Sequence, residues 1–450
     1  MRRPTLAAAL SALALTIAFA VPRFARADDN DDIEKDINDL AAQQKTAEGG
    51  KASAADLEAM AKKILGTMSE IRKLPIKHSV TMEVATREQI VGYVDSRMKE
   101  EMKPNELDGQ EAALKRLGLV PEKLDMKKFM LDLYGEQVAG YYDPFKQKFF
   151  IASWMAPMMQ APIMAHELTH ALQDQSFNLK PFLTPIPDNS DATSARQAVV
   201  EGDAVIAMFK YLGHQSGMDI TPPSVGEMIR NSMASPAYPT FMGAPAYFKE
   251  SLYFPYADGA DFIQKTLAAN KGDWASISAL YAHLPKSSEQ VLHPEKYLKD
   301  DPKPVDLAIK IPGWKEVHTD VLGELVLRTL LAGFLTDDQA RDAAEGWGGD
   351  RYRAFQREKG PKTVAGTMVV LRTTWDTEKD AKEFEAAYLA LLPKKYDGAR
   401  SKSDDHGTTF TTIEDGLARV ERSGSDVLIV DGAPDPDTLT KTTALAWPKK

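Results

Sequence analysis

The stretch Ala165-His166-Glu167-Leu168-Thr169-His170-Ala171-Leu172-Gln173-Asp174-Gln175 is the most informative part of the chain. Two histidines four residues apart lie on one face of a helix, so both imidazoles can reach the same ion. Glu167 is rotated away from that face, where its carboxylate can contact a water beside the ion. Zinc lowers the pKa of such a water to about 7, and a nearby carboxylate can take its proton. The spacing predicts zinc ligands at His166 and His170, with Glu167 as the catalytic base.

A catalytic zinc site takes three protein ligands and leaves one position open. The third candidate is Glu201, inside a helix predicted over about 192–212. The intervening segment 176–190 contains three prolines and lets this helix fold back onto the first. Gly202 allows the two helices a close approach. Asp203 points elsewhere on the helix and is the weaker choice of ligand.

Two further residues are candidates for supporting roles. Asp174 follows His170 by four residues, so its carboxylate can orient a ligating imidazole; a helix-end aspartate that bonds to backbone or solvent is the alternative. The developing oxyanion of a hydrolytic reaction needs a donor, usually Tyr or His. We take His293 as the candidate, with Tyr297 and Tyr256 as alternatives. A histidine simply packed in the loop before Pro294 also fits the sequence.

The apolar pattern outlines the elements around this motif. Lys148–Ser153 is predicted to be a strand, Gly140–Pro144 a turn, and 222–258 a long irregular segment rich in Pro and Met. Pro162 is expected in the first turn of the motif helix, and Asp191 is expected to cap the next one. Helices are predicted over 57–74, 84–101, 126–138, 162–175 and 192–212.

The predicted secondary structure changes at about residue 362, after which strands become frequent. Strands are predicted at 367–371, 417–420 and 427–430, with a helix at 377–391 between the first two. The sequence therefore predicts an α+β protein, with a mainly helical domain over 59–361 that contains a small sheet. Residues 362–450 are predicted to form a small C-terminal α+β domain.

The N-terminus has the pattern of an export signal. Arg2 and Arg3 precede an apolar run, and Ala25-Arg26-Ala27 fits a small-x-small cleavage site, so we predict a signal peptide at 1–27. An uncleaved membrane anchor is the alternative, but the run is short and acidic residues follow it directly. Residues 28–58 are interpreted as an acidic linker. The mature protein is expected to be exported, with no stable membrane insertion.

Composition narrows the chemistry further. The chain has no cysteine, which limits metal ligands to histidine, carboxylate and water. Its net charge is −10, and loss of the four arginines in residues 1–27 would make it more negative. Such a chain lacks the broad basic surface that nucleic-acid binding requires, so nucleic-acid partners are excluded.

The run His166–His170 followed by Glu201 resembles the gluzincin metallopeptidases, the thermolysin-like group. The resemblance implies a zincin-like fold, zinc bound by His166, His170 and Glu201, and Glu167 as general base. The interval from His170 to Glu201 is longer than in thermolysin itself. The chain is also similar to a group of exported bacterial proteins with a peptidase-like domain, which share the runs Gly140–Pro144, His166–Gln175, Glu201–Ala204, Glu289–Pro294 and Gly346–Tyr352.

These patterns together predict an exported zinc metallopeptidase that acts on a peptide or protein substrate. The resemblance also implies that the strand at 148–153 borders the substrate cleft and guides an extended peptide. Two alternatives remain open. One is a peptidase-like protein that binds a metal or a partner without turnover, and the other is an exported structural or interaction protein in which the motif arose by chance.

Overall fold

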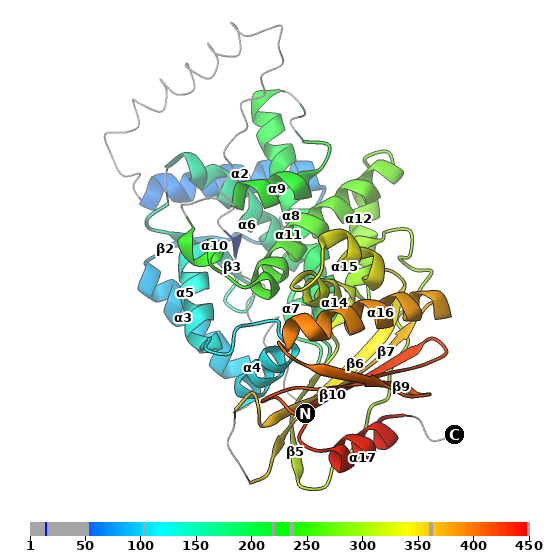
Figure 1. Cartoon of the computed structure of the whole chain (residues 1–450). Coiled ribbons are helices and arrows are strands. Elements are labelled where there is room, and N and C mark those ends of the chain that lie inside the picture. The colour runs from blue at the N-terminus through cyan, green and yellow to red at the C-terminus, as the bar shows by residue number, and fades with distance from the viewer. Residues whose placement is uncertain are drawn as a thin grey trace, which may run out of the picture.

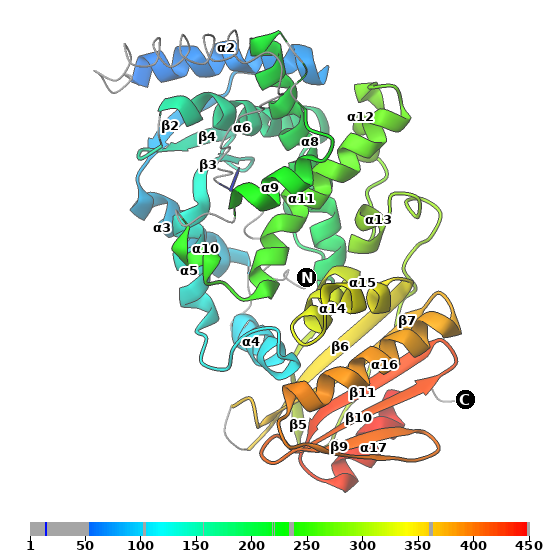
Figure 2. The ribbon, with the colours of Figure 1, turned by 45° about the horizontal axis from the view of Figure 1, so that its top comes forward.

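The computed structural model describes residues 14–15, 54–101, 105–155, 157–217, 219, 221–233, 238–359 and 363–447. The protein is α+β, as predicted: a helical body sits above a seven-stranded sheet (Figures 1 and 2). Apart from Ala14–Leu15, the predicted signal peptide lies outside the described residues. So does most of the predicted acidic linker, whose last residues, from Ala54 on, belong to the first helix of the body.

The helical body is built largely from helices that bury one apolar face. The predicted helices over 57–74, 84–101 and 126–138 are confirmed, and Ile64 and Met68 show why, since both are buried at helical spacing. None of the helices in the described part of the chain is long and apolar enough to cross a membrane. The helices of the body are α2 (Ala54–Arg72), α3 (Arg87–Glu101), α4 (Glu106–Leu117), α5 (Met126–Gln137), α6 (Pro157–Phe177), α7 (Lys180–Leu183), α8 (Ser190–Ser216), α9 (Val225–Met233), α10 (Pro239–Met242), α11 (Ala246–Ala269), α12 (Trp274–Leu280) and α13 (Ser288–Leu292).

Two predicted helix starts are wrong in detail. Helix α6 begins at Pro157, so Pro162 lies inside the helix rather than in its first turn. A proline there costs one backbone hydrogen bond, which this helix tolerates near its N-terminal end. Helix α8 is capped by Asn189, whose side chain accepts a hydrogen bond from the amide of Ala192. Asp191, the predicted cap, lies in the first turn, and its carboxylate accepts from the backbone amide of Ser288 instead.

The segment 222–258 is also more regular than predicted. It contains α9, α10 and the first half of α11. Two of its prolines mark helix starts, because Pro239 is the first residue of α10 and Pro245 is the N-cap of α11, whereas Pro255 lies inside α11. Proline has no amide hydrogen to leave unpaired at such positions. The high proline content of this segment is therefore compatible with three helices, because prolines can occupy helix starts.

A small four-stranded sheet lies beside α6. Its order is β1 (Ala14–Leu15), β3 (Val138–Asp143), β4 (Lys148–Ala152) and β2 (Thr81–Ala85). Strand β3 is antiparallel to both β1 and β4, whereas β2 is parallel to β4. The strand predicted at 148–153 is thus confirmed.

The turn predicted at Gly140–Pro144 is wrong, because its first four residues form the second half of β3. Tyr141 and Tyr142 are both buried although they point to opposite faces of the sheet, so the pair is typical of a covered strand. The turn begins only after Asp143, whose carboxylate accepts hydrogen bonds from the amides of Phe145 and Lys146.

The large sheet is antiparallel and covered on both faces. In β7 and β11, alternate residues enter two different cores, as the two-residue period of a strand requires. Val369 and Ile429 join the core shared with the helical body, whereas Val370 and Leu428 join a smaller core under α17. Helix α16 (Glu378–Lys395) crosses the face of the sheet that the helical body shares, and α17 (Pro436–Ala446) covers the opposite face (Figure 2). The strand order is β5 (Trp314–Asp320), β6 (Trp347–Arg357), β7 (Thr367–Trp375), β11 (Asp426–Ala433), β10 (Leu417–Ser423), β9 (Gly407–Thr411) and β8 (Arg400–Ser403).

The predicted C-terminal strands and the helix at 377–391 are confirmed as β7, β10, β11 and α16 (Glu378–Lys395). However, the sheet extends across the domain boundary predicted at residue 362. Strands β5 and β6 precede that residue; they pair with each other, and β6 also pairs with β7. The helices α14 (Gly323–Ala332) and α15 (Asp337–Ala344) connect them.

The closest helix contact of the body joins α8 to α11. A Cβ atom on Gly202 would lie 2.3 Å from the carbonyl carbon of Gly259, and one on Gly259 would lie 2.3 Å from the carbonyl oxygen of Ala198. The two glycines therefore let the backbones touch at the level of Glu201. The close approach predicted for Gly202 is therefore present, but it joins α8 to α11 and not, as predicted, to the motif helix α6.

We expect Gly202→Ala to lower the free energy of unfolding by about 1–3 kcal/mol or more, because the added methyl forces the two backbones apart. Chemical denaturation measures the change. The matched control is Gly66→Ala in α2, where an added Cβ meets nothing within 4 Å. That variant should be as stable as the parent or gain about 0.5–1 kcal/mol. Equal effects of the two substitutions would contradict the interpretation.

Candidate metal centre

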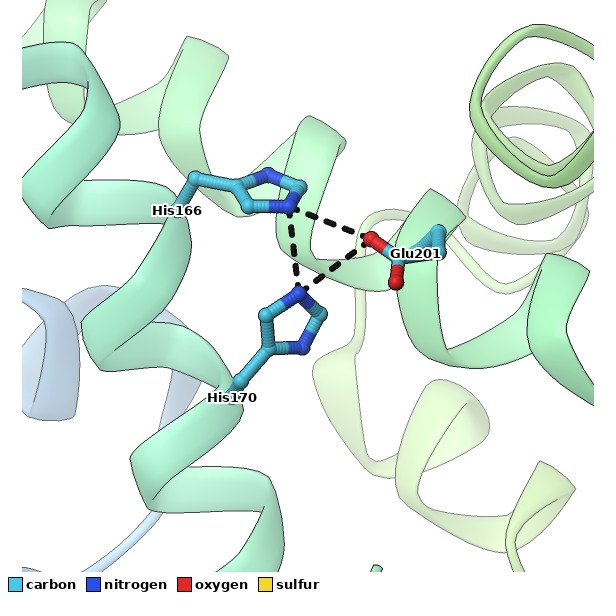
Figure 3. A group of neighbouring side chains, drawn as sticks. All are labelled: His166, His170 and Glu201. Atoms are coloured by element: carbon cyan, nitrogen blue, oxygen red, sulfur yellow. Dashed lines mark hydrogen bonds and ion pairs between the residues drawn. The ribbon is translucent and has the colours of Figure 1, made fainter. Parts of the chain in front are cut away.

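Three side chains predicted as ligands converge in the helical body. His166 and His170 project from one face of α6 toward Glu201 on α8 (Figure 3). The Nε2 atoms of the two histidines are 3.1 Å apart, and each lies 3.2 Å from Oε2 of Glu201. All three residues are at most 5% exposed. The helix spacing of His166 and His170 and the fold-back of α8 thus produce the predicted cluster.

The separations within this cluster fit a bound ion. A tetrahedral ion with bonds of about 2.0–2.1 Å to its ligands, as zinc makes, would hold them about 3.3 Å apart. Two imidazole nitrogens that face each other at 3.1 Å also need a proton or a cation between their lone pairs. Two imidazoles and a carboxylate form a donor set that suits first-row divalent metals.

Glu167 is the least satisfied acidic residue near this cluster. It is fully buried, and neither carboxylate oxygen has a hydrogen-bond partner within the described residues. Burial raises its pKa to about 8, although the positive charge of His170 and the backbone of Tyr142 act against the shift. A buried carboxylate without a partner is costly. Such a cost is typical of a functional group that awaits a ligand or a water molecule.

The three ligands influence one another's protonation. Burial lowers the pKa of His166. Burial also acts to lower the pKa of His170, but the carboxylates of Glu201 and Glu167 outweigh it and raise that pKa to about 9. Glu201 is likewise opposed by burial, yet the two histidines lower its pKa. Without an ion the cluster therefore holds a proton between carboxylate and imidazole, and a metal ion would displace that proton.

The supporting role predicted for Asp174 is not what the structure shows. Its carboxylate accepts hydrogen bonds from the hydroxyl of Tyr142 and the amide of Leu179, so it fixes β3 against the end of α6. Gln173 orients the ligand instead, because its Oε1 lies 2.8 Å from Nδ1 of His170. Gln173 lies three residues after His170 and on the same helix face, a spacing that could have identified it.

The amide of Gln173 is itself oriented by groups on α8. Its Nε2 donates to the carbonyl of Val200 at 3.1 Å and to Oδ2 of Asp203 at 3.0 Å. Both partners are acceptors, so the amide must direct its oxygen toward His170. That oxygen accepts from Nδ1–H, so Nε2, which faces the centre of the cluster, is the ring nitrogen that would bind an ion after losing its proton.

The carboxylate of Asp203 connects the groups that hold Gln173 in this orientation. Oδ1 accepts from Nε of Arg72 at 2.6 Å, and Oδ2 accepts from the hydroxyl of Tyr281 at 2.8 Å as well as from Gln173. Arg72 and Asp203 are completely buried. As predicted, Asp203 points away from the ligand cluster, but sequence reasoning did not find its role or that of Arg72.

The predicted oxyanion donor His293 is bound elsewhere. Its Nε2 lies 2.8 Å from Oε1 of the buried Glu324 on α14. Tyr297, the first alternative, donates its hydroxyl to the carbonyl of His283. Tyr256 on α11, the second alternative, lies beside the cluster, because its ring stacks on His166 with centroids 6.1 Å apart. The structure therefore brings Tyr256 to the cluster, and pairs His293 with Glu324.

We expect Gln173→Leu to weaken zinc binding by about 10- to 100-fold, since it leaves the His170 ring unoriented and Asp203 short of a donor. Zinc titration against a competing chelator measures the affinity. Gln175→Leu is the matched control, because the amide of Gln175 bonds to the backbone of Lys77 and His78 rather than to the cluster. An unchanged affinity in Gln173→Leu would show that the amide does not orient the ligand.

Comparison with known proteins finds a family match for one part of the chain. Residues 310–443 match a domain of unknown function, DUF8575. The match includes the large sheet from β5 to β11 and most of α17, and it lies outside the ligand cluster. No curated protein matches the chain, and no solved structure does.

Proposed function

We propose that the chain is an exported zinc metallopeptidase of the gluzincin type. The observation that carries this proposal is the buried group of His166, His170 and Glu201, with the unpartnered carboxylate of Glu167 one residue from the first ligand. A protein that bound the ion only for stability would have no use for a second buried carboxylate beside it. The paired helices α6 and α8, with a small sheet alongside, also agree with a zincin-like fold.

The roles follow from where each group lies. His166, His170 and Glu201 would hold the ion, which when bound supplies a water of lowered pKa and polarises a carbonyl. Glu167 accepts the proton of the attacking water and passes it to the leaving amine. Burial raises its pKa, which makes it a stronger base toward the attacking water, and the leaving amine, which is more basic still, then takes the proton. The hydroxyl of Tyr256 is the proposed donor to the developing oxyanion.

The substrate is proposed to bind along β3 rather than β4. The resemblance suggested the strand at 148–153, but β4 lies between β3 and β2 and has no free edge. Strand β3 borders the cluster, since the backbone of Tyr142 acts on the carboxylate of Glu167. An extended apolar segment of the chain itself, Ala14–Leu15, pairs with β3 antiparallel. Loss of this segment with the predicted signal peptide would free that edge of β3, and a peptide substrate would then add to it in the same way.

Three matched proteins test the proposal. The parent protein should bind close to one zinc per chain and hydrolyse members of a random peptide library. His166→Ala/His170→Ala should lose the zinc. Glu167→Gln should keep the zinc and lose at least about 100-fold in kcat/KM, because only the base is removed. Metal analysis and mass spectrometry of the peptides provide the measurements.

Each alternative function predicts a different result in these experiments. Zinc bound by the parent without hydrolysis of any peptide would favour a protein that binds a metal or partner without turnover. Absence of zinc, and of any stabilisation when zinc is added, would contradict the metallopeptidase proposal altogether.

A further inference from the structure

A cavity of about 90 Å³ lies in the helical body, outside the ligand cluster. Its lining residues on α8 and α11 lie on the N-terminal side of the contact at Gly202 and Gly259. Helices α4 and α5 and the segment after β5 close its other sides. Nothing in the catalytic proposal uses this space.

The cavity is aligned with the proposed metal site. Ser194 and Gln197 line it and precede Glu201 by about two turns and one turn of α8. At 100° per residue the three side chains fall on one stripe of the helix, with Cα atoms about 10 and 6 Å from that of Glu201 along the axis. On α11, Ser251 lines the cavity about one and a half turns before Tyr256, which stacks on His166. The cavity thus begins about one turn from the cluster along α8.

The polar part of its wall offers acceptors. The carboxylates of Asp191 and Asp320 belong to it, and both residues are at least 95% buried. Asp191 accepts from the amide of Ser288, and Asp320 from the amides of Ser190 and Val321. Burial raises the pKa of Asp320 to about 6 and that of Asp191 well above its ordinary value. The wall itself contains no Lys, Arg or His, although Arg351 and His318, which lie outside it, both act on Asp320.

A second observation concerns the side-chain amide of Gln110 and does not involve the two carboxylates. Gln110 is 3% exposed and lines the same cavity, and its Oε1 has no hydrogen-bond partner among the described residues. A buried acceptor without a donor is rare in native proteins. It indicates that the cavity normally receives a group rich in N–H donors.

The rest of the wall suits the stem of such a group. Tyr134, Tyr247 and Tyr352 contribute aromatic rings, and methionine and leucine side chains fill the space between them. Aromatic faces attract ammonium and guanidinium groups, while apolar walls pack against a methylene chain.

We propose that this cavity is a specificity pocket that binds the side chain of a lysine or arginine of the substrate. The inference rests on the proposed peptidase function and adds its substrate class. The stem of the basic side chain would run along the α8 stripe of Glu201, Gln197 and Ser194, beside the backbone contact of α8 with α11. Its charged head donates to Gln110 and reaches toward the carboxylates of Asp191 and Asp320.

The first test does not depend on activity. Ser194→Lys places an ammonium group in the cavity, and Ser194→Met places a chain of similar length there without the charge. We expect the lysine variant to melt at a temperature higher by about 2 °C or more. A higher melting temperature for the methionine variant would show that the cavity prefers apolar groups, and would overturn the inference.

The second test uses the zinc-loaded protein. Peptides that differ only by Lys, Arg or norleucine next to the cleaved bond should show a preference for the basic residue of at least about tenfold in kcat/KM. Asp320→Asn keeps the shape of the side chain and removes its charge, so most of this preference should disappear. The control is Asp350→Asn. Asp350 is equally buried and has a pKa raised to about 6, but it lies outside the cavity wall.

The outcomes separate the two proposals. Cleavage without any basic preference, or with a preference that both asparagine variants keep, would overturn the pocket and leave the peptidase intact. Absence of all cleavage would count against the peptidase. In that case the two Ser194 variants still decide whether the cavity accepts a cation.

Discussion

The buried ion pair between Arg72 and Asp203 is the interaction on which the functional part of the structure depends. It joins α2 to α8, and through Gln173 the same carboxylate reaches α6 and the ring of His170. A buried pair of this kind adds little net stability compared with apolar packing, but loss of one partner is severe, because it leaves an unpaired charge in the interior. The arrangement fixes the relative position of three helices. It therefore favours a unique geometry of the ligand cluster more than it favours overall stability.

The sheet below is continuous with this helical framework. One core includes the apolar faces of α6 and α8 and also the inner face of the large sheet, including Leu371 and Ile429. Polar contacts reinforce the joint. Asp350, in the Gly346–Tyr352 run, accepts hydrogen bonds from the amides of Leu322 and Gly323 at the start of α14, and from the indole of Trp347. This run, which had no role assignable from sequence, thus holds the start of a helix against the sheet.

The sequence was sufficient to predict those features that follow from a single physical rule. A period of 3.6 residues located the helices, and the spacing of His166 and His170 identified two ligands, because both follow from helix geometry alone. The failures have a common cause. Strand β3, the helices of 222–258, and the role of Gln173 depend on what each residue packs against, and a tertiary contact overrode the local signal. Asp174 shows this most clearly, since its helix position suits His170 but its carboxylate is taken by Tyr142 and Leu179. The boundary predicted at residue 362 falls inside the large sheet, because β5 has no clear apolar alternation that would indicate a strand in the sequence.

The cluster joins residues 35 positions apart in a chain that has no cysteine. An ion held there would act as a cross-link, since it would close the loop between His166 and Glu201 as a disulfide closes a loop. The unfolded chain would lose conformational entropy in proportion to the logarithm of the loop length. Unlike a disulfide, this cross-link would respond to the concentration of free metal, because binding to the folded state alone stabilises it by mass action. The durability of the fold would then follow the metal supply of the compartment in which the protein works.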